Sequence, residues 1–356
     1  MLKSRFESMG CYMPVKVVTS KELMDKMETK PIFDLGDVTG IENRRYRSET
    51  EDSFQLGLAA AKDCLSHSKY KAKDIEVVIW TSITQLKNGS EFSYEPSMSL
   101  YIKNELGANA ALNFDISNAC AGMLTGVFIL DNLIRGGIVK NGLVLSGECI
   151  THISDTALKE IKEPIDDQFA SLTVGDSGAA VIMDQSPNEE EGLEVSEFLT
   201  MAEFADLCIG MPSALNPGIA MYAKAVELHA ESIKRVPRWL VEQLEKHEYL
   251  IRKYKNITRT IDFVIPHQTA LKVMLSAMKD IFAYAKTIEK IKDFEMPELL
   301  TYIQDFGNTS STSHFVVLYH ALKDKKVKPG NTVLLVPHAS GITVGAFFLR
   351  LGNLEV

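Results

Sequence analysis

Three apolar segments in the first half of the chain recur, in the same order, in the second half. The matched pairs are "DIEVVIW" (74–80) with "TIDFVIPH" (260–267), "NGLVLSG" (141–147) with "NTVLLVPHASG" (331–341), and "SGAAVIM" (177–183) with "VGAFFLR" (344–350). Strands that are apolar at nearly every position are buried on both faces, so helices must cover both sides of each sheet. The recurrence therefore predicts an internal duplication that gives two similar α/β halves.

A polar, acidic stretch, "DQSPNEEEG" (184–192), separates the two sets of segments. Such a stretch, with a proline and a run of like charges, is typical of a solvated loop. We therefore expect an N-terminal half over residues 1–184 and a C-terminal half over residues 185–356. Residues 223–259 and 268–300 are charged and have a helical pattern. The basic clusters within 223–259 are interpreted as solvated helix faces, with partner docking as the alternative.

Composition excludes several classes of protein. The net charge of −9 argues against a surface that coats nucleic acid. The N-terminus lacks the pattern of a signal peptide, and no apolar run approaches the ~18 residues that a membrane span needs. The five cysteines are scattered, odd in number and without metal-ligand spacing; they are Cys11, Cys64, Cys120, Cys149 and Cys208. This usage favours a reducing cytoplasm and predicts neither a disulfide framework nor a metal site.

Cys120 lies in "DISNACAGMLTG" (115–126), among residues too small to fill a core. The segment before it is apolar, and a helical pattern follows and ends at Gly136 and Gly137. A thiol at a helix N-terminus faces unpaired N–H groups and the positive end of the helix dipole, which favour the nucleophilic thiolate. Cys120 is therefore a candidate acyl-accepting nucleophile. A close-packed helix start is the alternative interpretation.

Candidate partners for Cys120 follow strands of the second half. His267 comes directly after the apolar segment "FVIP", and Asn308 lies in a glycine-containing turn at the position that echoes Cys120. Alone, His267 fits an ordinary surface or core histidine and Asn308 an ordinary turn residue. Three such residues at equivalent strand ends, together with the small-residue loop "HASG" (338–341), point instead to one active site.

At the level of motifs, the chain resembles the 3-oxoacyl-acyl-carrier-protein synthase III family of thiolase-fold condensing enzymes. The resemblance extends over nearly the whole chain. It is carried by "TGIENRRY" (39–46), "SNACAGMLTG" (117–126), "GDSGAAVIM" (175–183), "PHQTALK" (266–272), "DFGNTSSTS" (305–313) and "HASGITVGAFFLRL" (338–351). It implies an α/β thiolase-like fold, with two duplicated halves in a five-layered αβαβα arrangement.

The resemblance also implies roles for individual residues. Cys120 matches the residue that accepts the acyl group, and His267 and Asn308 match the pair that stabilises the developing enolate. The backbone N–H groups of Cys120 and Ser340 match an oxyanion hole, where losing one donor commonly costs ~10²–10³ in rate. The implied reaction is a Claisen condensation of two acyl thioesters carried on coenzyme A or acyl carrier protein. No further cofactor is implied.

Two positions depart from the pattern for binding coenzyme A. Family members hold this ligand with a Trp and an Arg just before the "TGI" motif, where this chain has Asp34 and Val38. The departure weakens the case for an ordinary adenine clamp and leaves room for a carrier-protein donor. Lys272, five residues after His267, matches a basic position that docks the carrier or the phosphates of coenzyme A.

Glu95 is the second departure, because ordinary members of the family have an aromatic residue there. In the family this position is contributed across a dimer interface to the acyl pocket of the partner, so the segment 90–104 implies a homodimer. A carboxylate at this place resembles the condensing enzymes of olefin pathways and ketosynthases of the dialkylresorcinol type. With a simple acyl thioester as second substrate, Glu95 would be the general base; with a malonyl-type thioester, decarboxylation makes a base optional. A surface glutamate before a proline is the alternative interpretation.

Other functions remain open from the sequence. The same fold serves acyl transfer from Cys120 to a hydroxyl or amine acceptor without formation of a carbon–carbon bond. A non-catalytic subunit that stabilises an active paralogue has no need for an intact Cys/His/Asn set, which argues against that function. A papain-like protease is disfavoured by the duplicated α/β pattern. Acyl chain lengths, the type of carrier and the pathway do not follow from the residues.

Overall fold

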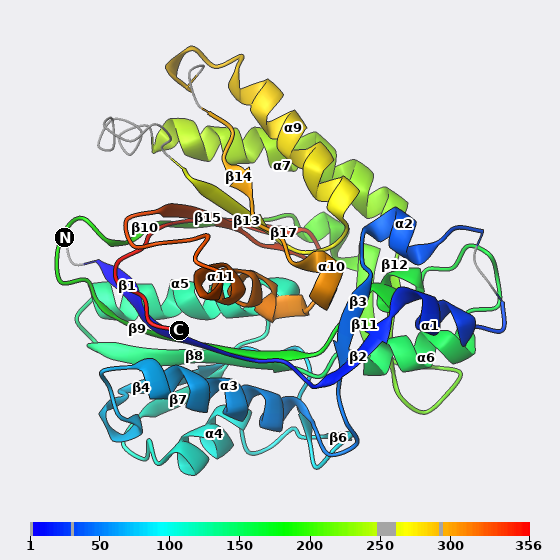
Figure 1. The fold of residues 1–356 in the computed structure, drawn as a ribbon, viewed down its shortest axis with the longest axis horizontal. Coiled ribbons are helices and arrows are strands. Elements are labelled where there is room, and N and C mark those ends of the chain that lie inside the picture. Colours follow the sequence, from blue (N-terminus) through cyan, green and yellow to red (C-terminus); the bar gives the residue numbers. More distant parts are fainter. Residues whose placement is uncertain (1–2, 30–31, 248–260, 292–294) are drawn as a thin grey trace.

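The computed structural model describes residues 3–29, 32–247, 261–291 and 295–356. Its elements form five layers, in the order helices, sheet, helices, sheet, helices (Figure 1). In Figure 1 the helices α7 and α9 lie at the top, α5 and α11 lie between the two sheets, and α3 and α4 lie at the bottom. The five-layered αβαβα arrangement that the sequence predicts is confirmed.

The N-terminal sheet has the strand order β1-β9-β8-β4-β7. Its antiparallel pairs are β1 with β9 and β9 with β8, and its parallel pairs are β8 with β4 and β4 with β7. The bounds are β1 (Ser4–Tyr12), β4 (Val77–Trp80), β7 (Leu112–Asp115), β8 (Asn141–Glu148) and β9 (Ser177–Gln185).

The C-terminal sheet repeats this pattern as β10-β17-β15-β13-β14, again with two antiparallel pairs followed by two parallel pairs. Its bounds are β10 (Gly192–Thr200), β13 (Phe263–Pro266), β14 (Glu298–Leu299), β15 (Thr332–Val336) and β17 (Thr343–Arg350), with β16 (His338–Ala339) paired to β17. The recurring segments of the sequence are the equivalent strands β4 and β13, β8 and β15, and β9 and β17.

The loop between β9 and β10 covers most of the polar stretch 184–192. The boundary that we place after residue 184 falls one residue before the end of β9, and it stays a prediction. The helical expectation for 268–300 is wrong at its end, because α9 (Leu271–Ala285) is followed by the short strand β14. This segment completes the edge of the C-terminal sheet, and pairing with β13 overrides its local helical pattern. For 223–259, residues 225–246 form α7, and 248–260 lie outside the described residues.

The middle layer consists of one helix from each half, α5 (Gly122–Arg135) and α11 (Ser313–Lys323). The main core cluster joins buried side chains of both sheets and both of these helices, among them Ile79, Val127, Phe315 and Phe347. The two halves therefore share one core.

The remaining elements extend this framework. The helices are α1 (Ser20–Asp25), α2 (Leu35–Thr39), α3 (Ser53–His67), α4 (Met98–Leu106), α6 (His152–Glu160), α7 (Ala225–Lys246) and α10 (Ile303–Phe306). Short 3-10 helices are η1 (Ala72–Asp74), η2 (Ala119–Ala121), η3 (Phe169–Thr173), η4 (Ala202–Leu207), η5 (Glu289–Ile291) and η6 (Ser310–Thr312). Two-stranded sheets pair β2 (Lys16–Thr19) with β3 (Asn43–Tyr46), β5 (Leu86–Lys87) with β6 (Glu91–Phe92), and β11 (Cys208–Pro212) with β12 (Ile219–Ala223). Among the helices of the described ranges, none is both long and apolar enough to cross a membrane.

Candidate active site

Cys120 is the central residue of η2, the short turn between the end of β7 and the start of α5. Ala119 before it has φ of 43°, a left-handed conformation that a residue with a Cβ rarely adopts. Such local strain persists only where the surrounding structure enforces it, and it is common at functional sites. As a whole residue, Cys120 is partly exposed.

The small residues after Cys120 serve the packing of α5. A Cβ atom on Gly122 would lie 2.5 Å from the carbonyl oxygen of Thr81, and a Cβ atom on Gly126 would lie 2.6 Å from Val144 Cγ1. These glycines lie four residues apart, so they share the helix face that meets the N-terminal sheet. The sequence interpretation of an open backbone is therefore incomplete, since the glycines also let the helix approach the strands that support Cys120.

The turn that contains Asn308 contacts Cys120 through Ser310. The Ser310 hydroxyl donates a hydrogen bond to Cys120 Sγ at 3.8 Å, and the Ser310 backbone N–H donates to Asn308 Oδ1 at 2.9 Å. Because Oδ1 accepts this bond, the amide group of Asn308 is oriented with Nδ2 as its remaining donor. Backbone hydrogen bonds to Thr173 and Gly175, at 2.9 and 3.0 Å, fix the main chain of Asn308.

The sequence pairs Cys120 with Asn308 as equivalent positions of the two halves, but in the structure the equivalent position lies three residues after Asn308. The turns η2 and η6 precede the equivalent helices α5 and α11, and each begins with a residue of positive φ, Ala119 at 43° and Ser310 at 56°. The residue of η6 that corresponds to Cys120 is therefore Ser311. Asn308 lies just outside the turn and is linked to Cys120 through Ser310, which donates hydrogen bonds to both side chains.

His267 follows β13, as the sequence predicts, and its backbone N–H donates to the carbonyl of Val336 at 3.0 Å. The side chain is 4% exposed and stacks on the ring of His314, with centroids 5.9 Å apart. Burial lowers the pKa of His267 well below its ordinary value, and the nearby His314 and His338 lower it further. The imidazole is therefore neutral at pH 7, and it can donate a hydrogen bond without carrying a charge.

Ser340 lies in the loop between β16 and β17. Both of these strands contact η2, which brings this loop to the turn of Cys120. The Ser340 hydroxyl donates to Cys208 Sγ at 3.1 Å. Cys208 is thus a second thiol close to the nucleophile, and sequence analysis treats it only as one of five scattered cysteines.

The acidity of Cys120 differs from the sequence expectation. Burial raises the pKa of its thiol to about 12, while the hydrogen bond from Ser310 lowers it. Cys208 and Glu148 raise it further. Desolvation therefore outweighs the helix N-terminus, and the resting side chain is a thiol at pH 7. For Cys120 Sγ to act as a nucleophile, this thiol would have to lose its proton as it attacks.

The positions linked to carrier or coenzyme docking lie on α2 and α9. Asp34 is the N-cap of α2, where its side chain accepts a hydrogen bond from the N–H of Asp37 at 3.0 Å. This capping gives Asp34 a structural role in place of an adenine clamp. Val38 is 47% exposed. Lys272 is exposed in the first turn of α9, which contacts α2.

Glu95 is exposed on the segment between β6 and α4. The start of α4, which follows this segment, is tied to the end of β7, because the carboxylate of Asp115 accepts hydrogen bonds from the N–H groups of Met98 and Ser99 at 2.8 and 3.0 Å. Glu95 therefore lies at the margin of the N-terminal sheet with its side chain open to solvent in the single chain.

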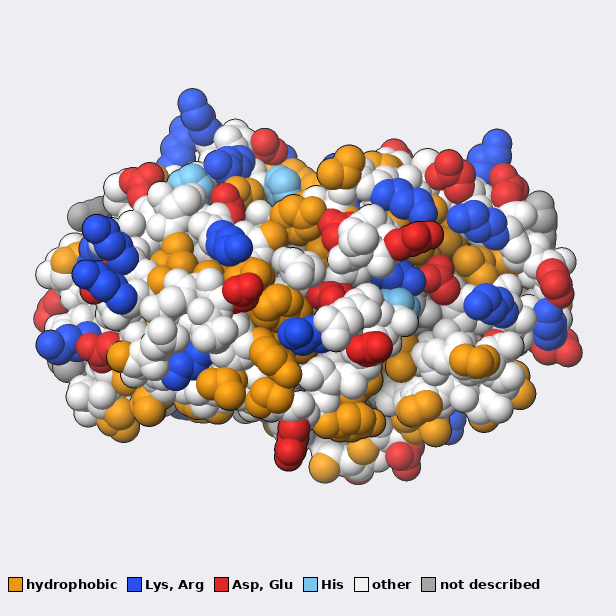
Figure 2. Space-filling view, turned by 90° about the horizontal axis from the view of Figure 1, so that it is seen from below, with side chains coloured by type: hydrophobic (Ala, Val, Ile, Leu, Met, Phe, Trp, Pro, Cys, Tyr) orange, Lys and Arg blue, Asp and Glu red, His pale blue; other side chains and the backbone are white. Residues whose placement is uncertain are grey.

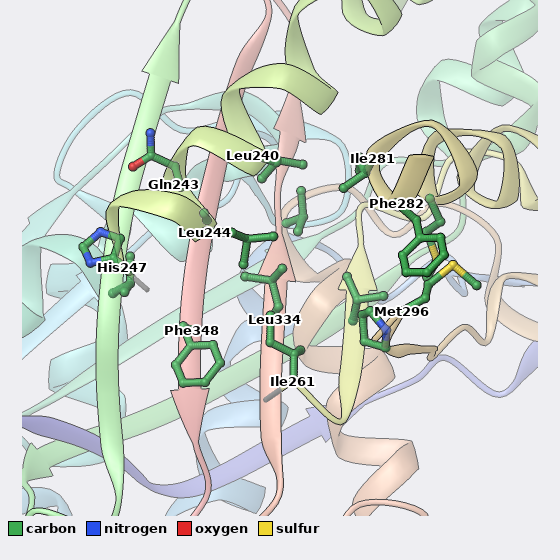
Figure 3. Close-up of a pocket in the computed structure, with 16 residues that line it drawn as sticks. Leu240, Gln243, Leu244, His247, Ile261, Ile281, Phe282, Met296, Leu334 and Phe348 are labelled. Carbon is green, nitrogen blue, oxygen red and sulfur yellow. The ribbon is translucent and has the colours of Figure 1, made fainter. Parts of the chain in front are cut away.

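A separate apolar cavity of about 80 Å³ lies between α7, α9 and the outer face of the C-terminal sheet (Figure 3). Figure 3 shows Leu240, Leu244 and Ile281 pointing from the helices toward Leu334 of β15. The sheet separates this layer from α5, so the cavity lies away from the Cys120 turn (Figure 1).

Comparison with known proteins places this arrangement in a family. The family model for 3-oxoacyl-acyl-carrier-protein (ACP) synthase III matches residues 114–202, and the model for the C-terminal part of the same family matches residues 253–351. Together the two matches cover more than half of the chain, and they include Cys120, His267 and Asn308. The chain belongs to the 3-oxoacyl-ACP synthase III family. The condensing function of this family, predicted from the sequence motifs, is confirmed.

Relatives within the synthase III family align over almost the full length. A beta-ketoacyl-acyl-carrier-protein synthase III from Clostridium perfringens is 25% identical over 99% of this chain and 100% of its own length. The corresponding protein of Bacillus pumilus is 27% identical over 97% of this chain and 98% of its own length. No residue role is transferred by identities of this size alone.

Solved structures show the same fold. The crystal structure of 3-oxoacyl-acyl-carrier-protein synthase III from Aquifex aeolicus is 25% identical, with a TM-score of 0.75 over 98% of this chain and 99% of that one. A variant of OleA from Xanthomonas campestris is 20% identical, with a TM-score of 0.80 over 98% of both chains. The likeness to OleA shows the fold alone.

Proposed function

We propose that the protein forms an acyl-enzyme on Cys120 and then joins that acyl group to a second acyl thioester. In the first step Cys120 Sγ attacks the thioester carbonyl, a carbon–sulfur bond forms, and the carrier thiol leaves with the proton. In the second step the α-carbon of the other thioester loses its proton, or carbon dioxide if it is a malonyl-type thioester, and attacks the carbonyl of the acyl-enzyme. A carbon–carbon bond forms, the carbon–sulfur bond to Cys120 breaks, and the departing thiolate takes up a proton to regenerate the thiol. The place of Cys120 in a strained turn, with its sulfur hydrogen-bonded by Ser310 of the Asn308 turn, carries this proposal.

The charge that develops in the second step lies on the carbonyl oxygen of the nucleophilic thioester. His267 is neutral and able to donate, and Asn308 Oδ1 is occupied, so its Nδ2–H group is available. Two neutral donors fixed in a buried site stabilise an enolate without the reorganisation that water requires. We assign the oxyanion hole for the acyl-enzyme to the backbone N–H groups of Cys120 and Ser340.

We assign Glu95 as a general base that acts on the site of the partner subunit in a homodimer. The strand β7 is the edge of its sheet and has an exposed Leu112, which suits pairing with a second copy. Phe92 and Tyr94 flank Glu95 and are 48% and 84% exposed, although their rings contact each other at 4.6 Å between centroids. Figure 2 shows apolar patches between the charges on the side of α3 and α4. Contact with a partner would cover these groups.

We assign the docking of the substrate carrier to the first turn of α9. Its N-cap is Ala270, whose side chain makes no capping hydrogen bond, and Lys272 adds a positive charge. Unsatisfied N–H groups at a helix N-terminus, together with a lysine, suit the phosphate of a pantetheine carrier. Both coenzyme A and acyl carrier protein supply that phosphate, and the capping role of Asp34 favours the carrier protein.

Intact-protein mass spectrometry tests the covalent step. After incubation with an acyl thioester, the mass of the protein should rise by one acyl group, whereas Cys120→Ala should show no adduct. The matched control is Cys208→Ala, which removes the neighbouring thiol and should keep the adduct. An adduct of normal yield on the Cys120→Ala protein would disprove the assignment of the nucleophile. Product analysis of the wild-type reaction then separates condensation from acyl transfer to a hydroxyl or amine.

A further inference from the structure

Glu148 is the last residue of β8, and its side chain is fully buried. Within the described ranges, its carboxylate is surrounded by hydrogen-bond donors and is paired with no cation. The donors are the Ser311 hydroxyl, Ser82 Oγ at 3.2 Å, the N–H of Ile83 at 3.3 Å, Ser146 Oγ at 3.3 Å and Thr84 Oγ1 at 3.4 Å. A buried carboxylate without a cation is costly even when it is hydrogen-bonded, and an apolar side chain at the end of β8 would avoid that cost.

The hydrogen bonds of Glu148 connect three segments. They join the loop after β4, through Ser82, to β8 itself and to η6, through Ser311. Ser311 is held a second time, because its Oγ lies 2.9 Å from Ser146 Oγ. Ser311 is also the residue of the second half that corresponds to Cys120. The carboxylate therefore fixes the turn that places Ser310 against Cys120 Sγ.

We propose that Glu148 is a positioning residue, which holds the η6 turn against Cys120 and sets how readily the Cys120 thiol loses its proton. It acts through Ser311 and Ser310, and it is assigned no contact with substrate. The inference rests on the proposed role of Cys120 as nucleophile. It does not depend on what the acyl-enzyme reacts with.

Glu148 has two opposing effects on the pKa of the Cys120 thiol. Through Ser311 it keeps Ser310 in place, and the Ser310 hydrogen bond lowers the pKa of Cys120. When Glu148 is ionised, its negative charge raises that pKa, while burial raises the pKa of Glu148 itself. The nearby Cys208 on β11 also raises the pKa of Cys120, and burial raises the pKa of the Cys208 thiol in turn. Within the described ranges, His267 after β13, His314 on α11 and His338 on β16 are titratable groups near this site, and burial lowers the pKa of all three, so they add no charge at pH 7.

These two effects are separable by substitution. Glu148→Gln removes the charge, while its Oε1 still accepts the Ser311 hydroxyl. Ser311→Ala keeps the charge and releases the turn. The readout is the rate at which iodoacetamide alkylates Cys120 at each pH, measured on the Cys120 peptide by mass spectrometry so that Cys208 does not contribute. We expect the Glu148→Gln profile to shift to lower pH by ~0.5 unit or more, which is about threefold faster alkylation at a fixed pH. The Ser311→Ala profile should shift to higher pH.

Glu160→Gln is the matched control, because Glu160 is also a buried glutamate, 5% exposed, with hydrogen bonds from Gln168 and Asn216 at 3.0 Å. It should leave the alkylation profile of Cys120 unchanged. A Glu148→Gln profile that coincides with wild type, a shift of both test variants in the same direction, or a shift in the control would each overturn the proposal. If Glu148→Gln does not fold, Ser311→Ala decides alone, and an unshifted profile overturns it. Alkylation needs no acyl substrate, so failure here is distinguishable from failure of the proposed condensation.

Discussion

Ser310 donates its hydroxyl to the sulfur of Cys120 across 3.8 Å, although the two residues are 190 positions apart in the chain. Each residue belongs to a short turn that begins a middle-layer helix, η2 for Cys120 and η6 for Ser310. Cys120 of the first half is thus held by the equivalent turn of the second half. This contact exists only because the two halves pack against each other.

Removing the Ser310 hydroxyl should weaken the nucleophile. Ser310→Ala loses the hydrogen bond that lowers the pKa of Cys120, so the thiolate fraction at pH 7.5 falls. We expect iodoacetamide to alkylate Cys120 ~3- to 10-fold more slowly, which corresponds to about 0.5–1 pKa unit. Ser310→Gly is the control for backbone strain, since glycine accepts the positive φ and also lacks the hydroxyl. Two variants with equal loss assign the effect to the hydroxyl, and wild-type rates in both would contradict it.

Glu95→Gln should leave acylation of Cys120 intact and reduce condensation by ~10²-fold or more, as expected for a lost general base. Mixing Glu95→Gln subunits with Cys120→Ala subunits tests action across the dimer. A mixed dimer has one site with both an intact Cys120 and an intact Glu95, so a random mixture should recover about a quarter of wild-type activity. No recovery in subunits shown to exchange would place Glu95 in its own site or outside the mechanism. Full condensation by Glu95→Gln alone would restore the decarboxylative alternative.

Gly122→Ala should destabilise the protein, although alanine is ordinarily the better helix former. The added Cβ would lie 2.5 Å from the Thr81 carbonyl, so α5 or the chain after β4 must move. We expect the free energy of unfolding to fall by about 1–3 kcal/mol, with slower acylation of Cys120 because its turn moves with the helix. Gly210→Ala is the control, because a Cβ there meets no heavy atom within 4 Å. Equal denaturant midpoints for the two variants would show that the contact between α5 and the Thr81 carbonyl can accommodate a Cβ atom at position 122.

Acid should destabilise the fold through its buried histidines. Burial lowers the pKa of His314 to about 4, whereas its unfolded value is 6.5. The unfolded state therefore binds more protons, and the stability from neutral His314 is full above pH 6.5 and is lost as pH falls toward 4. Between pH 7 and pH 5 this loss is about 2 kcal/mol for one such histidine. Urea unfolding at both pH values should show that His314→Leu loses about that much less than wild type. Equal losses would mean that His314 is not held neutral.

The family resemblance implied the five-layered order of the fold. The sequence itself predicted the two α/β halves, because the six recurring segments are apolar at nearly every position, which leaves little freedom in where helices can pack. It failed at β14, where two residues pair with β13 at the sheet edge. Such a short strand has no periodicity of its own, and only the neighbouring strand defines it. The sequence also could not show that Ser311, three residues after Asn308, is the residue equivalent to Cys120. The turns η2 and η6 align by a positive φ angle at Ala119 and at Ser310, and neither position has the glycine that would have signalled such an angle.

From the sequence, Cys120, His267 and Asn308 stood out by their own chemistry and by the family resemblance, and their roles stay predictions. Ser310 and Glu148 escaped notice for different reasons. Ser310 lies within the quoted motif "DFGNTSSTS", yet nothing in a run of hydroxyl residues says which one faces the sulfur. Glu148 ends an apolar strand, so its carboxylate departs from the apolar pattern. The sequence does not show, however, that this side chain is buried beside the η6 turn. The thiol acidity was mispredicted because desolvation depends on the whole environment of Cys120 and not on its place at a helix start.

The shared middle layer makes each half an incomplete protein. Helix α5 comes from one half and α11 from the other, and each sheet is covered on its inner side only when both are present. A backbone break in the loop between β9 and β10 would leave two fragments, each with an apolar inner sheet face that its own helix covers only in part. Neither fragment could bury that face alone, and their reassembly would create the contact between Ser310 and Cys120 anew. The hydrogen bond between Ser310 and Cys120 would therefore form only after the two fragments had reassembled.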